Sequence, residues 1–127
     1  MKKFLKNLLI FSIFGLTYGL IEILWRGYTH PSMVILGGIC GLIIGLLNEK
    51  SRNINPLIQM ILGMIIITSF EFITGYILNI QLGLGIWDYS NMRYNVMGQI
   101  CPQFSIVWFF LSYAIVYIDD FIRKVIK

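Results

Sequence analysis

The stretch PLIQMILGMIIITSFEFITGYIL, residues 56–78, contains only one charged side chain, Glu71. A helix that crosses a bilayer needs roughly 20 predominantly apolar residues, whereas a shorter apolar run is typical of a core helix in a soluble protein. This run is therefore long enough to cross a membrane. Proline has a backbone angle suited to the first turn of a helix, so Pro56 is expected to begin it.

Three further runs have the same character. The four together predict an all-α integral membrane protein with transmembrane helices over about 4–25, 31–48, 56–78 and 104–122. The chain has 127 residues, of which 57% are hydrophobic and 13% are charged. Four spans leave no room for a soluble domain, so residues 1–127 are predicted to form a single membrane-embedded domain. The first run is too long for a signal peptide and no A-x-A-like site follows it, so we interpret it as a retained span.

The distribution of basic residues predicts the orientation of the helices. Two of them, Arg26 and Arg93, fall on one side of the predicted spans. The other side carries Lys2, Lys3, Lys6, Lys50, Arg52, Arg123, Lys124 and Lys127. Short loops rich in Lys and Arg stay in the cytoplasm, so both termini are expected there, in a multi-pass protein of the cytoplasmic membrane. Topology and the lipid bilayer thus explain the net charge of +4, and no nucleic-acid partner is expected.

Small residues predict how the helices pack. Gly37, Gly41 and Gly45 recur every four residues in the second predicted helix. Such a ladder lets helix backbones approach closely in lipid, and this one predicts either a tight bundle or an oligomer face. Because four short helices rarely enclose a transport path, a homo-oligomer is expected, with a dimer favoured. Cys40 and Cys101 lack metal-like spacing and are expected as free thiols.

Residues 80–101, which connect the third and fourth runs, are polar and aromatic. We expect them to form a partly helical segment on the outer side, lying in the membrane interface or dipping into the bundle. Aromatic rings favour the headgroup level of a bilayer, which suits Trp87 and Tyr89. At the opposite ends of the helices, Glu49, Asp119 and Asp120 stand beside basic residues and are interpreted as interface charges.

Glu71 and Glu22 are candidates for function because both lie inside predicted spans, at comparable depth. A charge at the bilayer centre costs at least about 2.5–3.5 kcal/mol on insertion scales, so ionisable residues there usually serve function. Glu22 and Arg26 have the i, i+4 spacing of a helical ion pair. A polar site open to the outside would bind a cation, a proton or a small polar solute, and a purely architectural cluster is the alternative. Its candidate binding residues are Glu22, Arg26, Glu71, Trp87, Asp88, Tyr89, Arg93, Asn95 and Gln99.

Signatures of catalysis are missing from the sequence, which has no G-x-S-x-G, HExxH or P-loop motif. The single histidine, His30, has no Cys or His partner at metal-ligand spacing. We therefore expect no cofactor and no enzyme activity, although a membrane enzyme acting on lipid headgroups is left open, as is the metal content of the site. If ATP drives the protein, a separate ATPase subunit must supply it.

The motifs EFITG at 71–75, WDYS at 87–90 and NVMGQIC at 95–101 resemble those of the bacterial family labelled putative ABC-transporter type IV, also called CmpB-like. Glu22 and the RGY sequence at 26–28 are similar to the first half of that family, whereas His30 stands where the family usually has Gly before Pro. The resemblance covers nearly the whole chain and implies a transporter permease. A non-transporting accessory, sensor or structural subunit is the alternative.

Overall fold

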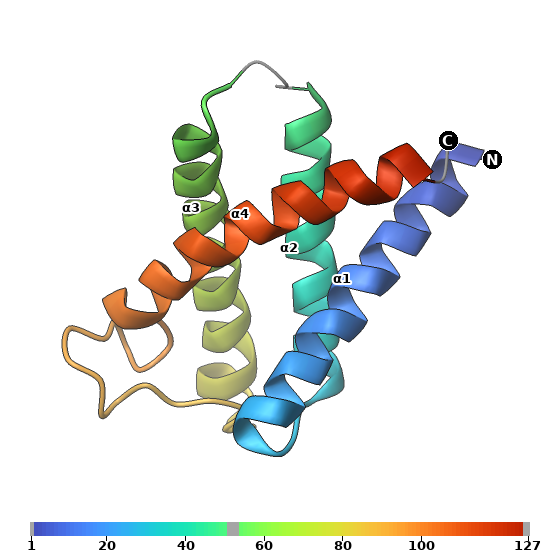
Figure 1. The fold of residues 1–127 in the computed structure, drawn as a ribbon. Helices are drawn as coiled ribbons and strands as arrows, with labels where there is room; N and C mark the ends of the chain where they lie inside the picture. The colour runs from blue at the N-terminus through green and yellow to red at the C-terminus, as the bar shows by residue number, and fades with distance from the viewer. Residues whose placement is uncertain (1, 51–53, 126–127) are drawn as a thin grey trace. The chain divides into compact units, whose positions relative to one another are not determined.

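The computed structural model describes residues 2–50 and 54–125, which form four long helices and a long connecting segment (Figure 1). Helix α1 spans Lys2–Arg26, α2 spans Pro31–Lys50 and α4 spans Pro102–Val125. Helix α3, Pro56–Gly75, continues into a π-helix, η1, at Tyr76–Gln81. All four are long and apolar enough to cross a membrane, which confirms the four predicted spans. Arg52 and Lys127, which entered the predicted charge count, lie outside the described residues.

Sequence signals set the ends of these helices. Proline opens α2, α3 and α4, because its fixed backbone angle suits the first turn and its missing N–H is not needed there. The side chain of Asn55 caps α3 by accepting a hydrogen bond from the backbone N–H of Leu57 at 2.8 Å. Helix α1 stops before Gly27, whose positive φ of 85° suits glycine and ends the helical path.

The chain divides into two compact units, which we describe separately. The first contains Met1–Ile54 and Ala114–Lys127, that is, α1, α2 and the C-terminal part of α4. The second contains Asn55–Tyr113, that is, α3, η1, the connecting segment and the N-terminal part of α4.

Glycines bring α1 and α2 of the first unit into close contact. A Cβ atom added at Gly15 would lie 2.6 Å from the carbonyl oxygen of Val34, and one added at Gly38 would lie 2.8 Å from that of Phe11. In the ladder, a Cβ at Gly41 would overlap the Phe14 side chain. Glycine therefore permits this approach, and the prediction that the ladder faces a neighbouring helix is confirmed.

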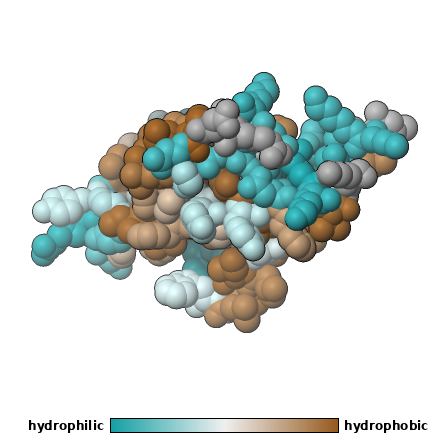
Figure 2. Space-filling view, turned by 45° about the horizontal axis from the view of Figure 1, so that its top comes forward, coloured by the Kyte–Doolittle hydropathy of each residue, from teal (hydrophilic) through white to brown (hydrophobic). Residues whose placement is uncertain are grey.

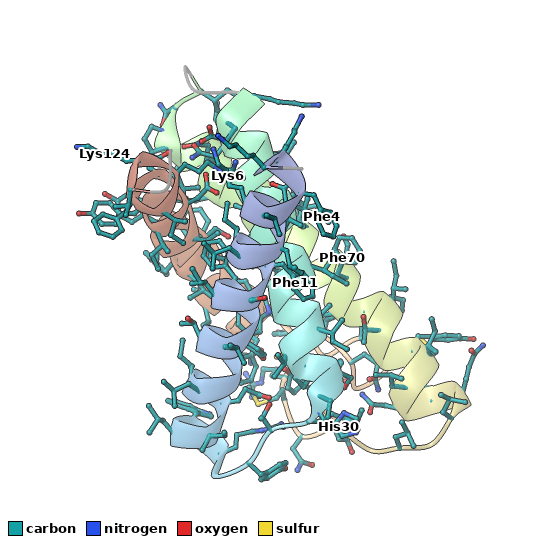
Figure 3. The ribbon with its side chains drawn as sticks, turned by 90° about the vertical axis from the view of Figure 1, so that its right-hand side faces the viewer. Phe4, Lys6, Phe11, His30, Phe70 and Lys124 are labelled. Atoms are coloured by element: carbon teal, nitrogen blue, oxygen red, sulfur yellow. The ribbon has the colours of Figure 1, made fainter. Side chains whose placement is uncertain are left out.

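Lys6 and Lys124 lie at one end of the first unit, whereas His30, in the turn between α1 and α2, lies at the other (Figure 3). The N-terminal part of α1 and the C-terminal part of α4 are therefore at the same end of this unit.

On the face drawn in Figure 2, many apolar side chains are exposed next to a group of hydrophilic side chains. Leu24, for example, is 78% exposed although it lies within a helix long enough to span a membrane. Contact with lipid tails is favourable for exposed apolar side chains, whereas contact with water is not, so this surface is suited to a bilayer. Cys40 and Cys101 are both buried and are not joined to each other by a disulfide bond.

In the second unit, residues 82–101 form a compact cap of turns, and we use the name cap for this segment. The expectation of a partly helical segment is wrong here, because helix ends at Gln81 and resumes only at Pro102. The cap instead holds an isolated antiparallel bridge between Val96 and Ile100. Its tight turns place Tyr94, Met97 and three glycines at positive φ, a geometry that regular helix does not contain.

Candidate functional site

Glu71, near the C-terminal end of α3, is the most deeply buried glutamate that the structure describes, with 3% of its surface exposed. The hydroxyl of Tyr89, from the cap, donates a hydrogen bond to Glu71 Oε2 at 2.8 Å. The indole N–H of Trp108, from α4, donates to Glu71 Oε1 at 3.2 Å. Each carboxylate oxygen thus accepts from a different aromatic side chain. Hydrogen bonds to both oxygens offset part of the cost of removing a carboxylate from water.

The two donors belong to a continuous row of three rings. Tyr89 stacks on Phe104 with ring centroids 4.8 Å apart, and Phe104 lies 6.0 Å from Trp108. Phe104 and Trp108 are four residues apart on α4, so helical geometry places both on one face. Trp108 is buried, whereas Tyr89 and Phe104 are half-buried. Both ends of the row, Tyr89 and Trp108, therefore contact the buried carboxylate, and Phe104 lies between them.

A second set of contacts fastens the cap to the end of α3. Asn79, in η1, accepts from the backbone N–H of Ile86 at 2.6 Å and donates to the side-chain oxygen of Gln99 at 2.8 Å. The indole N–H of Trp87 donates to the backbone oxygen of Gln99 at 3.0 Å. A Cβ at Gly75 would overlap Gln99 and approach Trp87 to 2.9 Å, so the cap lies directly on that turn of α3. Single-turn π-helices occur often at functional sites.

Asp88 and Asn95 shape the cap from within. Asp88 is exposed and accepts hydrogen bonds from the backbone N–H and the hydroxyl of Ser90. These two hydrogen bonds lower the pKa of Asp88 from its ordinary value of 3.8. Asn95 donates to the backbone oxygen of Met92 at 2.8 Å and accepts from the N–H of Gly98 at 2.8 Å. Both side chains therefore hold turns together, as short polar side chains commonly do.

Glu22 and Arg26 belong to the first unit. Arg26 Nε lies 3.4 Å from Glu22 Oε2, which confirms the predicted i, i+4 ion pair, although Arg26 Nε makes no hydrogen bond there. The Thr29 hydroxyl donates to the other oxygen of Glu22 at 3.1 Å, and the guanidinium lies over the Tyr28 ring at 4.7 Å.

The remaining seven candidates belong to the second unit. Of these, Tyr89 contacts Glu71 directly, Trp87 and Gln99 fasten the cap, and Asp88 and Asn95 shape it. Arg93 is exposed on the cap.

Sequence reasoning missed Trp108, Phe104 and Asn79. Trp108 and Phe104 lie in an apolar run and look like ordinary membrane-facing residues. One signal could have found Trp108. A carboxylate inside a span needs hydrogen-bond donors, and the indole N–H of a tryptophan in another span can supply one. Asn79 was counted among the residues after a span rather than as a contact between span and cap.

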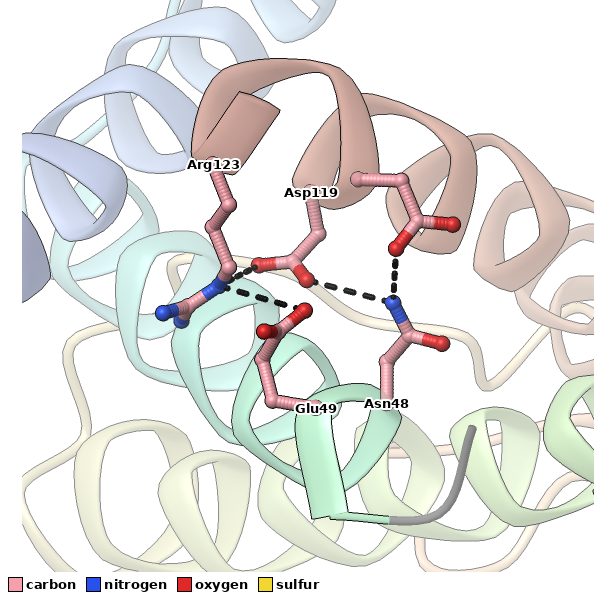
Figure 4. A network of polar contacts seen from close by, with 5 residues as sticks. Asn48, Glu49, Asp119 and Arg123 are labelled. Carbon is pink, nitrogen blue, oxygen red and sulfur yellow. Dashed lines mark hydrogen bonds and ion pairs between the residues drawn. The ribbon is translucent and has the colours of Figure 1, made fainter. Parts of the chain in front are cut away.

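A second polar cluster joins α2 to α4 in the first unit (Figure 4). Arg123 Nε lies 2.9 Å from Asp119 Oδ1 and 3.7 Å from Glu49 Oε2. The amide of Asn48 donates to Asp119 at 3.2 Å and to Asp120 at 2.7 Å. Asp119 has no exposed surface, a burial between helices that its interpretation as an interface charge did not include. We call these five residues the α2–α4 charge cluster.

Three carboxylates of this cluster have oxygens within 4.8 Å of one another, the spacing of a metal site. The geometry also supplies cationic and amide donors to those oxygens. Arg123 neutralises part of the negative charge, and the Asn48 amide binds both aspartates. The cluster therefore has an internal explanation as an ion-pair and hydrogen-bond network that holds α4 against α2.

Comparison with known proteins identifies one family for the chain. The family described as "Putative ABC-transporter type IV" matches residues 2–127. No solved structure matches the chain. The match and the four apolar helices together make this a multi-pass membrane protein.

Proposed function

Because the chain belongs to the family described as "Putative ABC-transporter type IV", we propose that it is a membrane transport protein for a cation or small polar solute, with Glu71 at its binding site. The hydrogen bond from Tyr89 to Glu71 carries this proposal. It joins a carboxylate buried in a span to a segment of non-helical turns. Turns of this kind rearrange more readily than packed helices, so movement of the cap would open Glu71 to solution.

Ionisable residues inside spans often mark solute pathways, because placing a charge in the membrane costs free energy and such residues are usually kept for function. Glu71 meets this description in its burial and in its position within α3. Trp87 and Gln99 would stabilise the closed cap. The hydrogen bond from Tyr89 to Glu71 would form when the cap is closed and break when it opens.

The test is solute flux in proteoliposomes that contain the full chain. The panel contains H⁺, Na⁺, K⁺ and tetramethylammonium, each measured with and without an imposed gradient. We expect Glu71→Gln to remain folded and to lose at least about tenfold in flux, because Gln keeps the size of the side chain and removes its charge. Asp120→Asn makes the same chemical change at an exposed carboxylate and should retain flux. A folded Glu71→Gln protein with unchanged flux would contradict the proposal and favour an accessory or structural subunit.

Orientation and assembly form a separate part of this proposal. We place both termini in the cytoplasm and the cap outside, on the basis of the lysine and arginine distribution. An impermeant thiol reagent applied to intact cells should label Asn91→Cys and spare Lys50→Cys in a background without Cys40 and Cys101. The reverse pattern would overturn the orientation.

We also propose a homodimer that works with a separate ATPase, since the chain contains no P-loop motif. The Gly37–Gly45 ladder is used within the chain, so the dimer would use another face. Light scattering on the detergent-solubilised protein measures the stoichiometry, and a monomeric mass would contradict the dimer.

A further inference from the structure

We propose that Glu71 and the ring row Tyr89, Phe104 and Trp108 bind an organic ammonium ion, a cation whose positive charge is carried by alkylated nitrogen. This inference deepens the proposed function and rests on it for the location of the site. It concerns the chemical class of the solute, which the family description does not give.

The residues around Glu71 combine one negative charge with several π-systems. The Tyr89 hydroxyl and the Trp108 indole N–H both contact the carboxylate, at 2.8 and 3.2 Å. Because both polar hydrogens lie in the planes of their rings, the carboxylate meets the edges of Tyr89 and Trp108, and a cation would reach the stacked face of Phe104 by taking the place of the Tyr89 ring. Phe104 continues the row at 4.8 Å from Tyr89 and 6.0 Å from Trp108. A cation within about 6 Å of such ring centroids is attracted by their faces.

Other classes of solute fit this set of groups less well. An anion would be repelled by the carboxylate of Glu71. Calcium and magnesium are bound by six or more oxygen ligands, whereas an indole N–H is a donor and cannot ligate a cation. Within the described residues, the three-carboxylate grouping is Glu49, Asp119 and Asp120, and Glu71 does not belong to it.

The exposure of the rings suits a weakly hydrated cation. Tyr89 and Phe104 are half-buried and Trp108 and Glu71 are buried, so the carboxylate is largely shielded from water. An alkylated ammonium ion loses less hydration on entering such surroundings than a compact ion does. Tyr89 comes from the cap, so its ring can leave the row when the cap moves, and this would admit the solute.

Binding is tested first, without transport. Tryptophan fluorescence of the purified full chain in detergent is titrated with tetramethylammonium chloride, with sodium chloride at equal ionic strength as the reference. Trp108 contacts Glu71, so occupancy should change its emission. We expect a saturable change with tetramethylammonium that sodium does not produce, and its loss in Glu71→Gln.

Two phenylalanine variants separate ring chemistry from charge alone. Phe104→Leu keeps an apolar side chain and removes a ring, and should weaken tetramethylammonium binding by about three- to tenfold, the range expected for one cation–π contact. Phe110→Leu, at a 64% exposed position of the same helix, should leave binding unchanged. Equal binding in all three proteins, with each shown to be folded by circular dichroism, would overturn the role of the rings.

The flux panel then distinguishes this inference from the proposed function. If Glu71-dependent flux is found for H⁺, Na⁺ or K⁺ while tetramethylammonium neither binds nor competes, the solute class is wrong and the transport proposal stands. If tetramethylammonium binds at Glu71 but no member of the panel is transported, the site is supported and transport is overturned. Saturable binding together with Glu71-dependent tetramethylammonium flux is the expected result.

Discussion

Asp119 and Glu71 are both buried carboxylates in helices that can span a membrane, yet the groups that contact them differ in kind. Asp119 lies 2.9 Å from a guanidinium, that of Arg123, on the same helix. Glu71 accepts from the phenol of Tyr89 and the indole of Trp108, two neutral donors from other segments. The first arrangement fixes a charge pair in place, whereas the second presents a carboxylate among rings.

This difference indicates different roles for the two carboxylates. A buried pair that loses one member leaves an uncompensated charge, so the α2–α4 charge cluster is suited to holding helices together. A carboxylate that accepts from two neutral donors can exchange one of them for a cation. The comparison therefore predicts a role in stability for Asp119 and supports the proposed role of Glu71 in solute binding, and the following predictions test it.

The largest effect is expected from removing one charge at each site. Asp119→Asn should lower the free energy of unfolding by about 3 kcal/mol, because Arg123 then stays buried without its closest carboxylate. Glu71→Gln should cost less than about 1 kcal/mol. The Gln oxygen can accept from Trp108, and its amide can donate to the Tyr89 hydroxyl, which accepts as well as donates. Denaturant unfolding in detergent micelles measures both, and equal losses would remove the distinction between the sites.

Removing a donor from Glu71 should have a smaller effect than Asp119→Asn and a larger one than Glu71→Gln, which keeps both hydrogen bonds. Tyr89→Phe keeps the ring that stacks on Phe104 and deletes the hydroxyl, so it should cost about 1.5 kcal/mol, as expected for a hydrogen bond to a charged group. Tyr94→Phe, at a 77% exposed position of the same cap, provides the control and should change stability little. The same unfolding measurement applies. Indistinguishable Tyr89 and Tyr94 variants would mean that the cap does not depend on Glu71.

Alanine variants of two glycines compare the rigidity of the α2–α4 charge cluster with that of the contact between α3 and the cap. A Cβ at Gly45 would overlap the carboxylate of Asp119, and a Cβ at Gly75 would overlap the side chain of Gln99. Overpacking costs about 1–3 kcal/mol, and alanine regains part of that through its higher helix propensity. We expect Gly45→Ala to lose about 1 kcal/mol, since Arg123 holds Asp119 in place.

Gly75→Ala should lose less overall stability but loosen the cap, whose turns can shift. Limited proteolysis of the cap, measured beside unfolding, detects this difference. If the cap of Gly75→Ala is cleaved no faster than that of the unmodified protein, the cap does not shift to make room for the added methyl group, and the prediction is wrong.

The smallest effect concerns pH and the exposed Asp88. Its pKa is lowered from 3.8 by the hydrogen bonds from Ser90, so the folded cap binds the ionised form more tightly. The resulting stabilisation is fully present above pH 3.8 and is lost as the pH falls through the lower pKa of the folded state. In the unmodified protein, the protection factor of the Ser90 amide against hydrogen exchange should fall as the pH is lowered through this window. In Asp88→Asn, the same protection factor should not depend on pH there. Unchanged protection of the unmodified cap down to pH 2 would contradict this account.

Much of the fold could be predicted because bilayer crossing imposes a length and a composition that can be read along the chain. The four spans, the proline starts and the Gly37–Gly45 contact surface all depend on neighbouring residues or on simple helical spacing. The i, i+4 pair of Glu22 and Arg26 was predictable for the same reason. The turns of the cap were not, because Tyr94 and Met97 have positive φ, a backbone conformation that residues with such side chains seldom adopt.

The sequence by itself determined that this is a multi-pass membrane protein, which of its carboxylates lie inside spans, and that Glu71 is a candidate for function. Only the tertiary structure decided what those carboxylates contact. Asp119 reads as an end-of-helix charge until α2 packs against it, and Glu71 has no visible donor until the cap and α4 supply Tyr89 and Trp108. The physical reason is that hydropathy and helical spacing are local properties. The partners of a buried charge, in contrast, come from segments 18 and 37 residues away, and only folding brings them together.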